Sequence, residues 1–375
     1  MISKSAPPSF VSGRWANNGI PMTSSIQFSN RVIGVDLAKI VAMVLVVAIH
    51  VNGSGLPYVG DGKPSIYYTL TKTFIGAVAM ACINIFAIAS GYVGIASSFK
   101  LSRIVKLWFQ VVFTGLAVLI FLDGFTGIRV TMLDYLKACI PIAKGQYWYM
   151  TAYFMLCFIM PILNMGIKSM EKKHLAFLLM LMLGIICGES LVCSGGALGV
   201  NSGYSFEWLV VLYVAGAYIR LYNPPLASGL ALAVCICGCA MIAGWMPGLL
   251  GKLHLTQVLK VPRLFDFGGY TSPFTVAIAI CIFTACLKIQ ICSECMCRLI
   301  RTLSATTLGV YLIHVQPVFF RHFGALCKRH FEVTGLGSYL LALVSLTGAF
   351  YIGCTILDYV RLRLFGALAK LCRHK

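Results

Sequence analysis

Long apolar runs separated by short polar segments fill the chain from about residue 33 to residue 360. Each run has the roughly 17–25 residues that a helix needs to cross the hydrocarbon core of a bilayer. The pattern therefore predicts an all-α fold, a polytopic membrane helix bundle with about ten transmembrane helices. The expected spans are 33–52, 73–96, 103–122, 147–167, 175–193, 207–222, 226–246, 270–289, 304–322 and 339–360.

Three parts of the chain follow from the same pattern. Residues 1–30 are polar and rich in Ser, Pro and Asn, which predicts a poorly ordered cytoplasmic N-terminal segment. Residues 31–362 form the predicted transmembrane domain, and residues 363–375 form a basic cytoplasmic tail. With the N-terminus placed inside, more Lys and Arg fall on inner than on outer segments, as the positive-inside rule requires. Both termini are therefore predicted to be cytoplasmic.

Composition strengthens the membrane assignment. The chain is 59% hydrophobic and 11% charged, with a mean hydropathy of +0.88, which is more apolar surface than a soluble domain can bury. The net charge of +19 is spread among the loops and is not gathered on one soluble module, so no nucleic-acid partner is expected. Membrane lipids are the expected surroundings.

The sixteen cysteines predict neither a disulfide framework nor a metal site. Most of them lie inside apolar runs, where Cys behaves as a small hydrophobic residue. Two clusters, "CICGC" at 235–239 and "CSECMC" at 292–297, lack the paired spacing of zinc ligands and have no His at a matching interval. Free thiols near the cytoplasmic face are the expected state, with no metal bound.

The first apolar run contains three ionisable residues, in the stretch "DLAKIVAMVLVVAIH" from Asp36 to His50. Ionisable groups inside spans are rare and indicate function by default. Lys39 and His50 are eleven residues apart, which returns them to nearly the same helix face with a rise of about 16 Å. Asp36 lies three residues before Lys39, where the two can pair. The alternative is that Lys39 extends to one interface and His50 lies at the other.

Lys39-x10-His50, preceded by Asp36, resembles the Arg/Lys-x10-His motif that opens the acyltransferase 3 family of bacterial membrane acyltransferases. Lys replaces the commoner Arg at position 39. Four later stretches resemble family segments in the same order, and the resemblance covers residues 31–360. They are "FAIASGYVG" (86–94), "FKLSRIVKLW" (99–108), "YWYMTAYFMLCFIMPILN" (147–164) and "GVYLIHVQP" (309–317).

The resemblance implies a multi-pass protein of the bacterial cytoplasmic (inner) membrane. It implies a membrane O-acyltransferase, and an O-acetyltransferase in particular. Such an enzyme moves an acyl group from acyl-CoA to a hydroxyl of a cell-envelope polysaccharide, such as O-antigen, or of its lipid-linked oligosaccharide precursor. Acetyl-CoA or another acyl-CoA is then a co-substrate, and no tightly bound cofactor is expected. Neutral imidazole suits a general base near pH 7, so His50 is expected to act as the base or as a transient acyl carrier.

The resemblance also implies where each substrate binds. Lys39 is expected to support His50 electrostatically, and Asp36 is expected to hold Lys39 in place. The phosphates of acyl-CoA cannot enter hydrocarbon readily, so basic groups at the cytoplasmic face are expected to hold them. The expected donor-binding residues are Lys39, Lys100, Arg103, Lys106 and Ser90, and the expected acceptor-binding residues are Trp148, Tyr149, Tyr311 and His314.

Several of these residues have a structural alternative. Ser90 suits ordinary helix packing. Trp148 and Tyr149 suit an interfacial aromatic belt. Tyr311 and His314 share a helix face, and His314 suits a buried structural hydrogen bond equally well.

Two other functions remain open at this stage. A transporter, flippase or polymerase for lipid-linked sugars is also polytopic and basic, but the chain shows no internal repeat and no pair of broken helices in two halves. A membrane sensor or scaffold would give Asp36, Lys39 and His50 no purpose. Loss of acyl esters from envelope glycans on deletion separates the enzyme from both.

Overall fold

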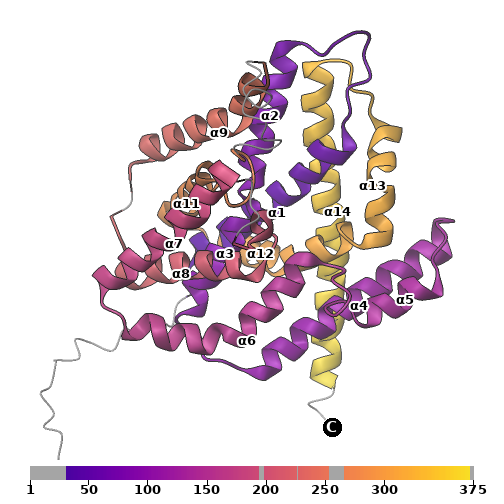
Figure 1. Ribbon diagram of the computed structural model, residues 1–375. Helices are drawn as coiled ribbons and strands as arrows, with labels where there is room; N and C mark the ends of the chain where they lie inside the picture. Colours follow the sequence, from indigo (N-terminus) through magenta and orange to yellow (C-terminus); the bar gives the residue numbers. More distant parts are fainter. Residues whose placement is uncertain (1–30, 194–197, 226, 253–265, 372–375) are drawn as a thin grey trace, which may run out of the picture. The chain divides into compact units, whose positions relative to one another are not determined.

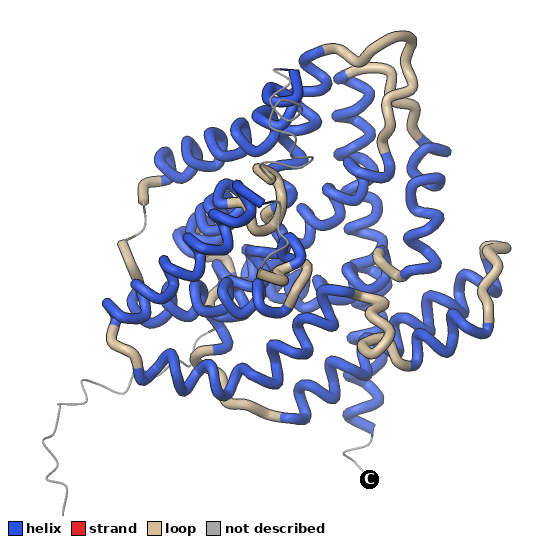
Figure 2. The backbone as a smooth tube through the Cα atoms, viewed as in Figure 1, coloured by secondary structure: helices blue, strands red, loops and turns tan. Residues whose placement is uncertain are grey.

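The computed structural model describes residues 31–193, 198–225, 227–252 and 266–371. Residues Val32–Lys375 form one compact unit, distinct from Met1–Arg31. Figures 1 and 2 show that the described part is built from helices without β-strands, so the predicted all-α class is confirmed. The expectation for residues 1–30 lies outside the described residues, whereas the basic tail is helical as far as Leu371.

The described helices follow one another in chain order. They are α1 (Ile33–His50), the π-helix η1 (Val51–Gly55), α2 (Ile66–Met80), α3 (Cys82–Gly94), α4 (Leu101–Phe125), α5 (Met132–Cys139), α6 (Trp148–Ser169), α7 (Lys172–Cys193), the 3₁₀ helix η2 (Asn201–Gly203), α8 (Phe206–Tyr222), α9 (Gly229–Lys252), α11 (Pro273–Lys288), α12 (Glu294–His314), α13 (Pro317–His330) and α14 (Leu336–Leu371).

Helix α1 lies in the middle of the bundle and packs against α2, α3, α11, α12 and α14. Its small residues permit this crowding, since Ala38 and Ala42 are fully buried. At Gly34 a Cβ atom would come within 2.6 Å of the Cys286 carbonyl oxygen of α11, so only glycine fits there. Close approach through small residues is the usual way in which helices associate in lipid. The stretch that carries Lys39 and His50 is therefore surrounded by protein.

Seven helices of the described residues are long and apolar enough to cross a membrane, or up to eight if the bent pair α12 and α13 counts as one span. The chain is therefore a multi-pass membrane protein, whereas the predicted number of ten spans stays a prediction. Helices α8 and α11 coincide with two further expected spans but have only 17 and 16 residues. The expected span 73–96 begins earlier, because α2 and α3 together form one span, Ile66–Gly94.

The expected continuous span 304–322 is wrong. Helix α12 ends at His314, and α13 begins at Pro317 after a bend of 85°. The proline ring disfavours helical backbone at the preceding residue, so Gln316 adopts an extended conformation. The side-chain oxygen of Gln316 then caps α13 by accepting hydrogen bonds of 2.8 and 2.9 Å from two backbone amides. The break leaves His314 in the last turn of its helix.

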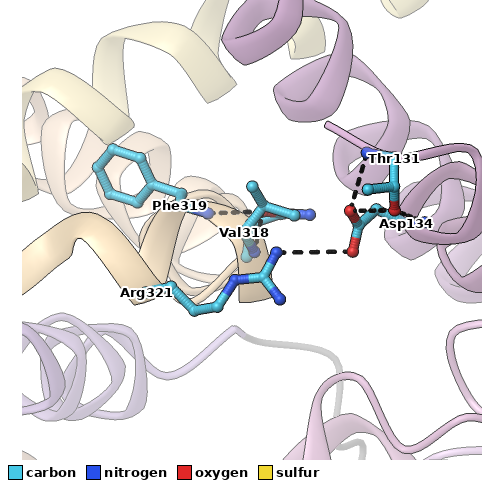
Figure 3. A network of polar contacts seen from close by, with 6 residues as sticks. Thr131, Asp134, Val318, Phe319 and Arg321 are labelled. Carbon is cyan, nitrogen blue, oxygen red and sulfur yellow. Dashed lines mark hydrogen bonds and ion pairs between the residues drawn. The ribbon is translucent and has the colours of Figure 1, made fainter. Parts of the chain in front are cut away.

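Helix α13 is held against the hairpin of α4 and α5. Figure 3 shows Arg321 of α13 facing Asp134 in the first turn of α5, with 3.6 Å between guanidinium and carboxylate. The Thr131 hydroxyl donates to the same carboxylate at 2.7 Å, and the two residues form a capping box that starts α5. Ala138 and Val318 belong to a small apolar cluster between these helices.

Candidate active site

A cavity of 680 Å³ lies among α1, α3, α4, α6 and α12. This volume is within the roughly 300–1,000 Å³ that is typical of small-molecule sites. Most of its wall is apolar, with residues such as Met43, Val46 and Phe86. Five helices that are far apart in sequence therefore build one elongated binding space.

Four basic side chains line one end of the cavity, which we call the basic end: Lys39, Lys100, Arg103 and Lys168. Lys100, Arg103 and Lys168 are exposed, so this end is open to the surroundings. Three of these four residues, Lys39, Lys100 and Arg103, were predicted donor-binding residues. The structure does not bring the fourth predicted cation, Lys106, to the cavity, because its side chain lies on an exposed face of α4 outside the lining.

Lys168 belongs to a stripe along α6 that the sequence reasoning missed. Nine residues of this helix line the cavity, and five of them form the stripe: Tyr149, Tyr153, Cys157, Asn164 and Lys168. They recur at intervals of four or seven residues, the spacing of one helix face. That periodicity was visible in the sequence, but nothing there indicated which helices the stripe would face.

Asn164 connects three helices beside the cavity. Its amide nitrogen donates to the Gly94 carbonyl of α3 at 3.0 Å, and its oxygen accepts from the Tyr213 hydroxyl of α8 at 2.7 Å. Both side-chain groups of the amide are therefore occupied within the protein. This arrangement fixes the wall that carries Lys168 relative to α3.

Asp36 has a partner on another helix. Its carboxylate accepts a hydrogen bond of 2.7 Å from the Ser304 hydroxyl of α12, and only 3% of Asp36 is exposed. Ser304 also lines the cavity, one helical turn from Thr307, which does the same. The predicted role of Asp36 as support for Lys39 stays a prediction. The structure adds that Asp36 joins α1 to α12 beside the basic end.

Ser90 lines the cavity from α3, as the donor-binding prediction requires. Its hydroxyl donates to the Phe86 carbonyl one turn earlier at 2.8 Å, a common bond of Ser within helices. The proton of this hydroxyl is thus already used. The Tyr153 hydroxyl lies within hydrogen-bonding distance of the Ser90 hydroxyl on the cavity wall.

The other end of the cavity approaches two histidines, and we call it the histidine end. Val46 of α1 and Tyr311 of α12 line it. His50 follows Val46 by four residues on the same helix face, and His314 follows Tyr311 by three. Neither histidine is itself part of the cavity lining. The cavity thus ends about one helical turn short of the histidine pair.

His50 and His314 are hydrogen-bonded to each other although they are 264 positions apart in the chain. His50 Nδ1 lies 3.1 Å from His314 Nε2, and His314 Nδ1 lies 2.6 Å from the Val310 carbonyl oxygen. A carbonyl can only accept, so His314 Nδ1 carries a proton. If both rings are neutral, His314 Nε2 must accept and His50 Nδ1 must donate. His50 Nε2 is then left unprotonated, with a lone pair.

The position of the His50 ring is fixed from several sides. Phe320 of α13 contacts it edge-on, with 4.9 Å between ring centroids. Helix α1 continues into the π-helix η1, where Asn52 accepts from the Tyr339 hydroxyl of α14 at 2.9 Å and donates to the Lys72 carbonyl of α2 at 3.3 Å. π-Helical turns are frequent at functional sites. Three other helices therefore hold the end of α1 that carries His50.

An aromatic cluster lies at the start of α6. The Trp148 ring is 4.6 Å from that of Tyr204 and 5.9 Å from that of Tyr270, while Tyr149 packs against Tyr311 at 6.1 Å. The structure therefore separates the predicted acceptor-binding residues. Tyr149 and Tyr311 line the cavity, whereas Trp148 contacts the half-exposed Tyr204 outside it.

This arrangement suits proton transfer at the inner end of the cavity. An imidazole nitrogen with a free lone pair can take a proton or attack a carbonyl. A second imidazole holds it in one tautomer, as the carboxylate does in a hydrolase triad. The basic end, about 16 Å away along α1, can hold an anionic group. Among the described residues, no three His, Cys, Asp or Glu side chains gather as metal ligands would.

Comparison with protein families gives one match. The model of the family Acyl_transf_3, described as an acyltransferase domain, matches residues 32–359. No curated protein matches the chain. No solved structure matches it either.

Proposed function

Because this chain belongs to the acyltransferase 3 family, we propose that it is a membrane O-acyltransferase. It transfers an acyl group, acetyl in particular, from acyl-CoA to a hydroxyl of a cell-envelope polysaccharide or of its lipid-linked precursor. The observation that carries this proposal is the hydrogen-bond chain from Val310 through His314 to His50. That chain leaves a basic nitrogen next to a cavity with a cationic entrance.

The donor is proposed to bind with its phosphates at the basic end. Lys39, Lys100, Arg103 and Lys168 come from three helices and one loop, so they can surround an anion from several sides. The flexible arm of acyl-CoA extends along the apolar wall toward Val46 and Tyr311. With the basic end at the cytoplasmic face of the inner membrane, the donor enters from the compartment in which acyl-CoA is made.

His50 is proposed to act through Nε2. In the base route, Nε2 takes the proton of the acceptor hydroxyl while that oxygen attacks the thioester carbon. The C–O bond forms, the C–S bond breaks, and the proton passes from His50 to the departing thiolate. In the carrier route, Nε2 itself attacks the thioester carbon, and the C–S bond breaks as the N–C bond forms, so the thiolate of CoA leaves. The acceptor hydroxyl then attacks the acyl carbon, the N–C bond breaks as the C–O bond forms, and the hydroxyl proton passes to the thiolate. Both routes need the tautomer that His314 supports.

The acceptor is proposed to approach from the start of α6. Trp148, Tyr204 and Tyr270 form an aromatic group there, and Tyr204 is 44% exposed. Aromatic rings offer flat apolar faces with polar edges, which suit a sugar ring. Tyr149 connects this group to the cavity wall, because its ring contacts both Trp148 and Tyr311.

The test is transfer by the purified protein in lipid. Acyl-CoA labelled in its acetyl group, incubated with envelope glycan or its lipid-linked precursor, is expected to give labelled glycan ester and free CoA in equal amounts. Mass spectrometry of envelope glycans from wild-type and deletion cells identifies the acyl group and the sugar. If deletion changes glycan export or chain length but removes no acyl ester, the proposal is wrong and a transport or polymerisation role replaces it.

A further inference from the structure

Tyr311 has a buried hydroxyl whose proton no described group accepts, although the backbone N–H of Tyr149 lies close to its oxygen. Eight buried side-chain atoms lack a hydrogen-bond partner among the described residues, and they belong to Thr114, Gln146, Thr275, Tyr311, Gln316, Thr347, Tyr351 and Thr355. Of these eight residues, Tyr311 alone lines the cavity. A buried polar group without a partner destabilises the fold, so its retention indicates a partner that arrives later.

Neighbouring rings hold Tyr311 in place beside the histidine pair. Its ring lies 6.4 Å from that of His314 in a T-shaped contact, and it packs between Tyr147 and Tyr149 at 6.0 and 6.1 Å. The Tyr147 hydroxyl donates to the Leu312 carbonyl on the same helix as Tyr311. The Tyr311 ring is therefore fixed by packing, and only 5% of the residue is exposed.

Other buried tyrosines of the bundle behave differently. The hydroxyl of Tyr147 donates to Leu312, that of Tyr213 to Asn164 and that of Tyr339 to Asn52. In each case the phenol joins two helices and its role is explained by the fold. Tyr311 contributes no such bond, although its ring is packed as tightly as theirs.

We propose that the Tyr311 hydroxyl is a catalytic hydrogen-bond donor to the carbonyl oxygen of the acyl thioester. This inference rests on the proposed acyl transfer. When the nucleophile attacks the carbonyl carbon, the π-electron pair moves onto that oxygen. The phenol donates to the developing oxyanion without giving up its proton. The pair returns as the C–S bond breaks, so Tyr311 leaves the step unchanged. A fixed donor in a site without water stabilises such charge strongly.

The location of Tyr311 fits this role, because His50 and the oxyanion donor must both reach the carbonyl group of the thioester. His50 supplies the basic nitrogen, and Tyr311 lies one helical turn before the histidine that holds His50. Both groups are therefore positioned by α12, near its break. Gln316, another donor without a partner in this region, does not line the cavity.

The test is Tyr311→Phe, which keeps the ring and removes the oxygen. We expect kcat for acyl transfer to fall about 10²-fold, the usual effect of removing one oxyanion donor. The Kd of S-ethyl-CoA, a donor analogue without the carbonyl, is expected to stay unchanged. Thermal stability is expected to stay unchanged or rise, because the variant removes an unsatisfied group.

Two controls separate catalysis from folding. Tyr351→Phe removes a buried hydroxyl of α14 that lies outside the cavity lining and is expected to retain wild-type kcat. Tyr213→Phe leaves Asn164 without its 2.7 Å donor and is expected to lower the melting temperature. Near-normal kcat in Tyr311→Phe, or a loss matched by weaker S-ethyl-CoA binding, overturns the Tyr311 role alone. A wild-type protein that transfers no acyl group from acyl-CoA overturns the proposed function and this inference together.

Discussion

The two ends of the cavity are built on different physical principles. The basic end gathers charges from three helices and one loop, and three of its four cations are exposed to solvent. At the histidine end, no carboxylate or lysine of the described residues contacts His50, and the geometry rests on the hydrogen-bond chain Val310–His314–His50. Charge acts over distance and tolerates rearrangement, whereas a tautomer depends on individual atoms. Mutations should therefore act gradually at one end and abruptly at the other.

The largest effect is expected for His50→Ala. Removing the group that moves the proton or carries the acyl group should lower kcat about 10³-fold or more. His322→Ala, which removes an exposed histidine of α13, is the matched control and should keep wild-type activity. Transfer of labelled acetyl at the wild-type rate by His50→Ala would show that His50 has no catalytic role.

The next effect is expected at His314. In His314→Leu, nothing accepts the His50 Nδ1 proton, so the tautomer and the ring orientation are lost and kcat should fall about 10²-fold. In His314→Gln, the amide oxygen can accept that proton, so part of the activity should return. A positioning role of His314 predicts this partial rescue by Gln, whereas a role in acceptor binding does not predict it.

The double variant measures whether the histidines act together. His314→Leu added to His50→Ala should cause no further loss, because a positioning residue has nothing left to position. If the losses of the two single variants multiply in the double variant, His314 does not act through His50. If the only defect of His314→Leu is a higher KM for glycan, His314 binds the acceptor.

Smaller and graded effects are expected at the basic end. Arg103→Gln and Lys168→Gln should each raise KM for acyl-CoA about 5-fold with little change in kcat, since a solvent-exposed ion pair contributes about 1 kcal/mol or less. The effects of the two changes should multiply and should weaken in high salt. Lys106→Gln is the control from the same helix, because Lys106 lies outside the cavity lining. An equal KM change in Lys106→Gln would show that only the overall surface charge matters.

The smallest effect is expected at the ion pair between Asp134 and Arg321, which supports the helix that carries Phe320. The pKa of Asp134 lies below its usual 3.8, chiefly because the Thr131 hydroxyl donates a hydrogen bond to its carboxylate. The Thr131 amide and the charge of Arg321 lower this pKa further. Because the folded-state pKa is depressed, the carboxylate stabilises the fold above about pH 4, and this contribution disappears as the pH falls through the lowered pKa.

Asp134→Asn should therefore lower the melting temperature slightly at pH 7, and this effect should shrink as the pH falls through the lowered pKa of Asp134. Arg321 is 62% exposed, so the change in stability should be under about 1 kcal/mol. Asp61→Asn, at an exposed loop aspartate, serves as control. A large loss of acyl transfer in Asp134→Asn would show that the histidine end depends on this surface pair as well as on its buried contacts.

The sequence determined the class of the protein and its family. Helical length and hydropathy predicted an all-helical membrane bundle, because each span must satisfy its own backbone hydrogen bonds in lipid. The spacing of Lys39 and His50 predicted one shared face, and the motif order predicted the family, which the match over residues 32–359 confirms. Local periodicity carries this information, so the amino-acid sequence alone was sufficient to predict the fold class and the family.

Tertiary structure decided which residues meet. Nothing near His314 in the sequence indicates that its ring binds His50, and nothing in α6 indicates that Lys168 joins Arg103 at one opening. The sequence shows a proline at position 317, but it does not predict the 85° bend that leaves His314 at a helix end. These features depend on how five helices pack in three dimensions. Packing is a long-range property of side-chain shape, and the hydrophobic pattern of one segment does not contain it.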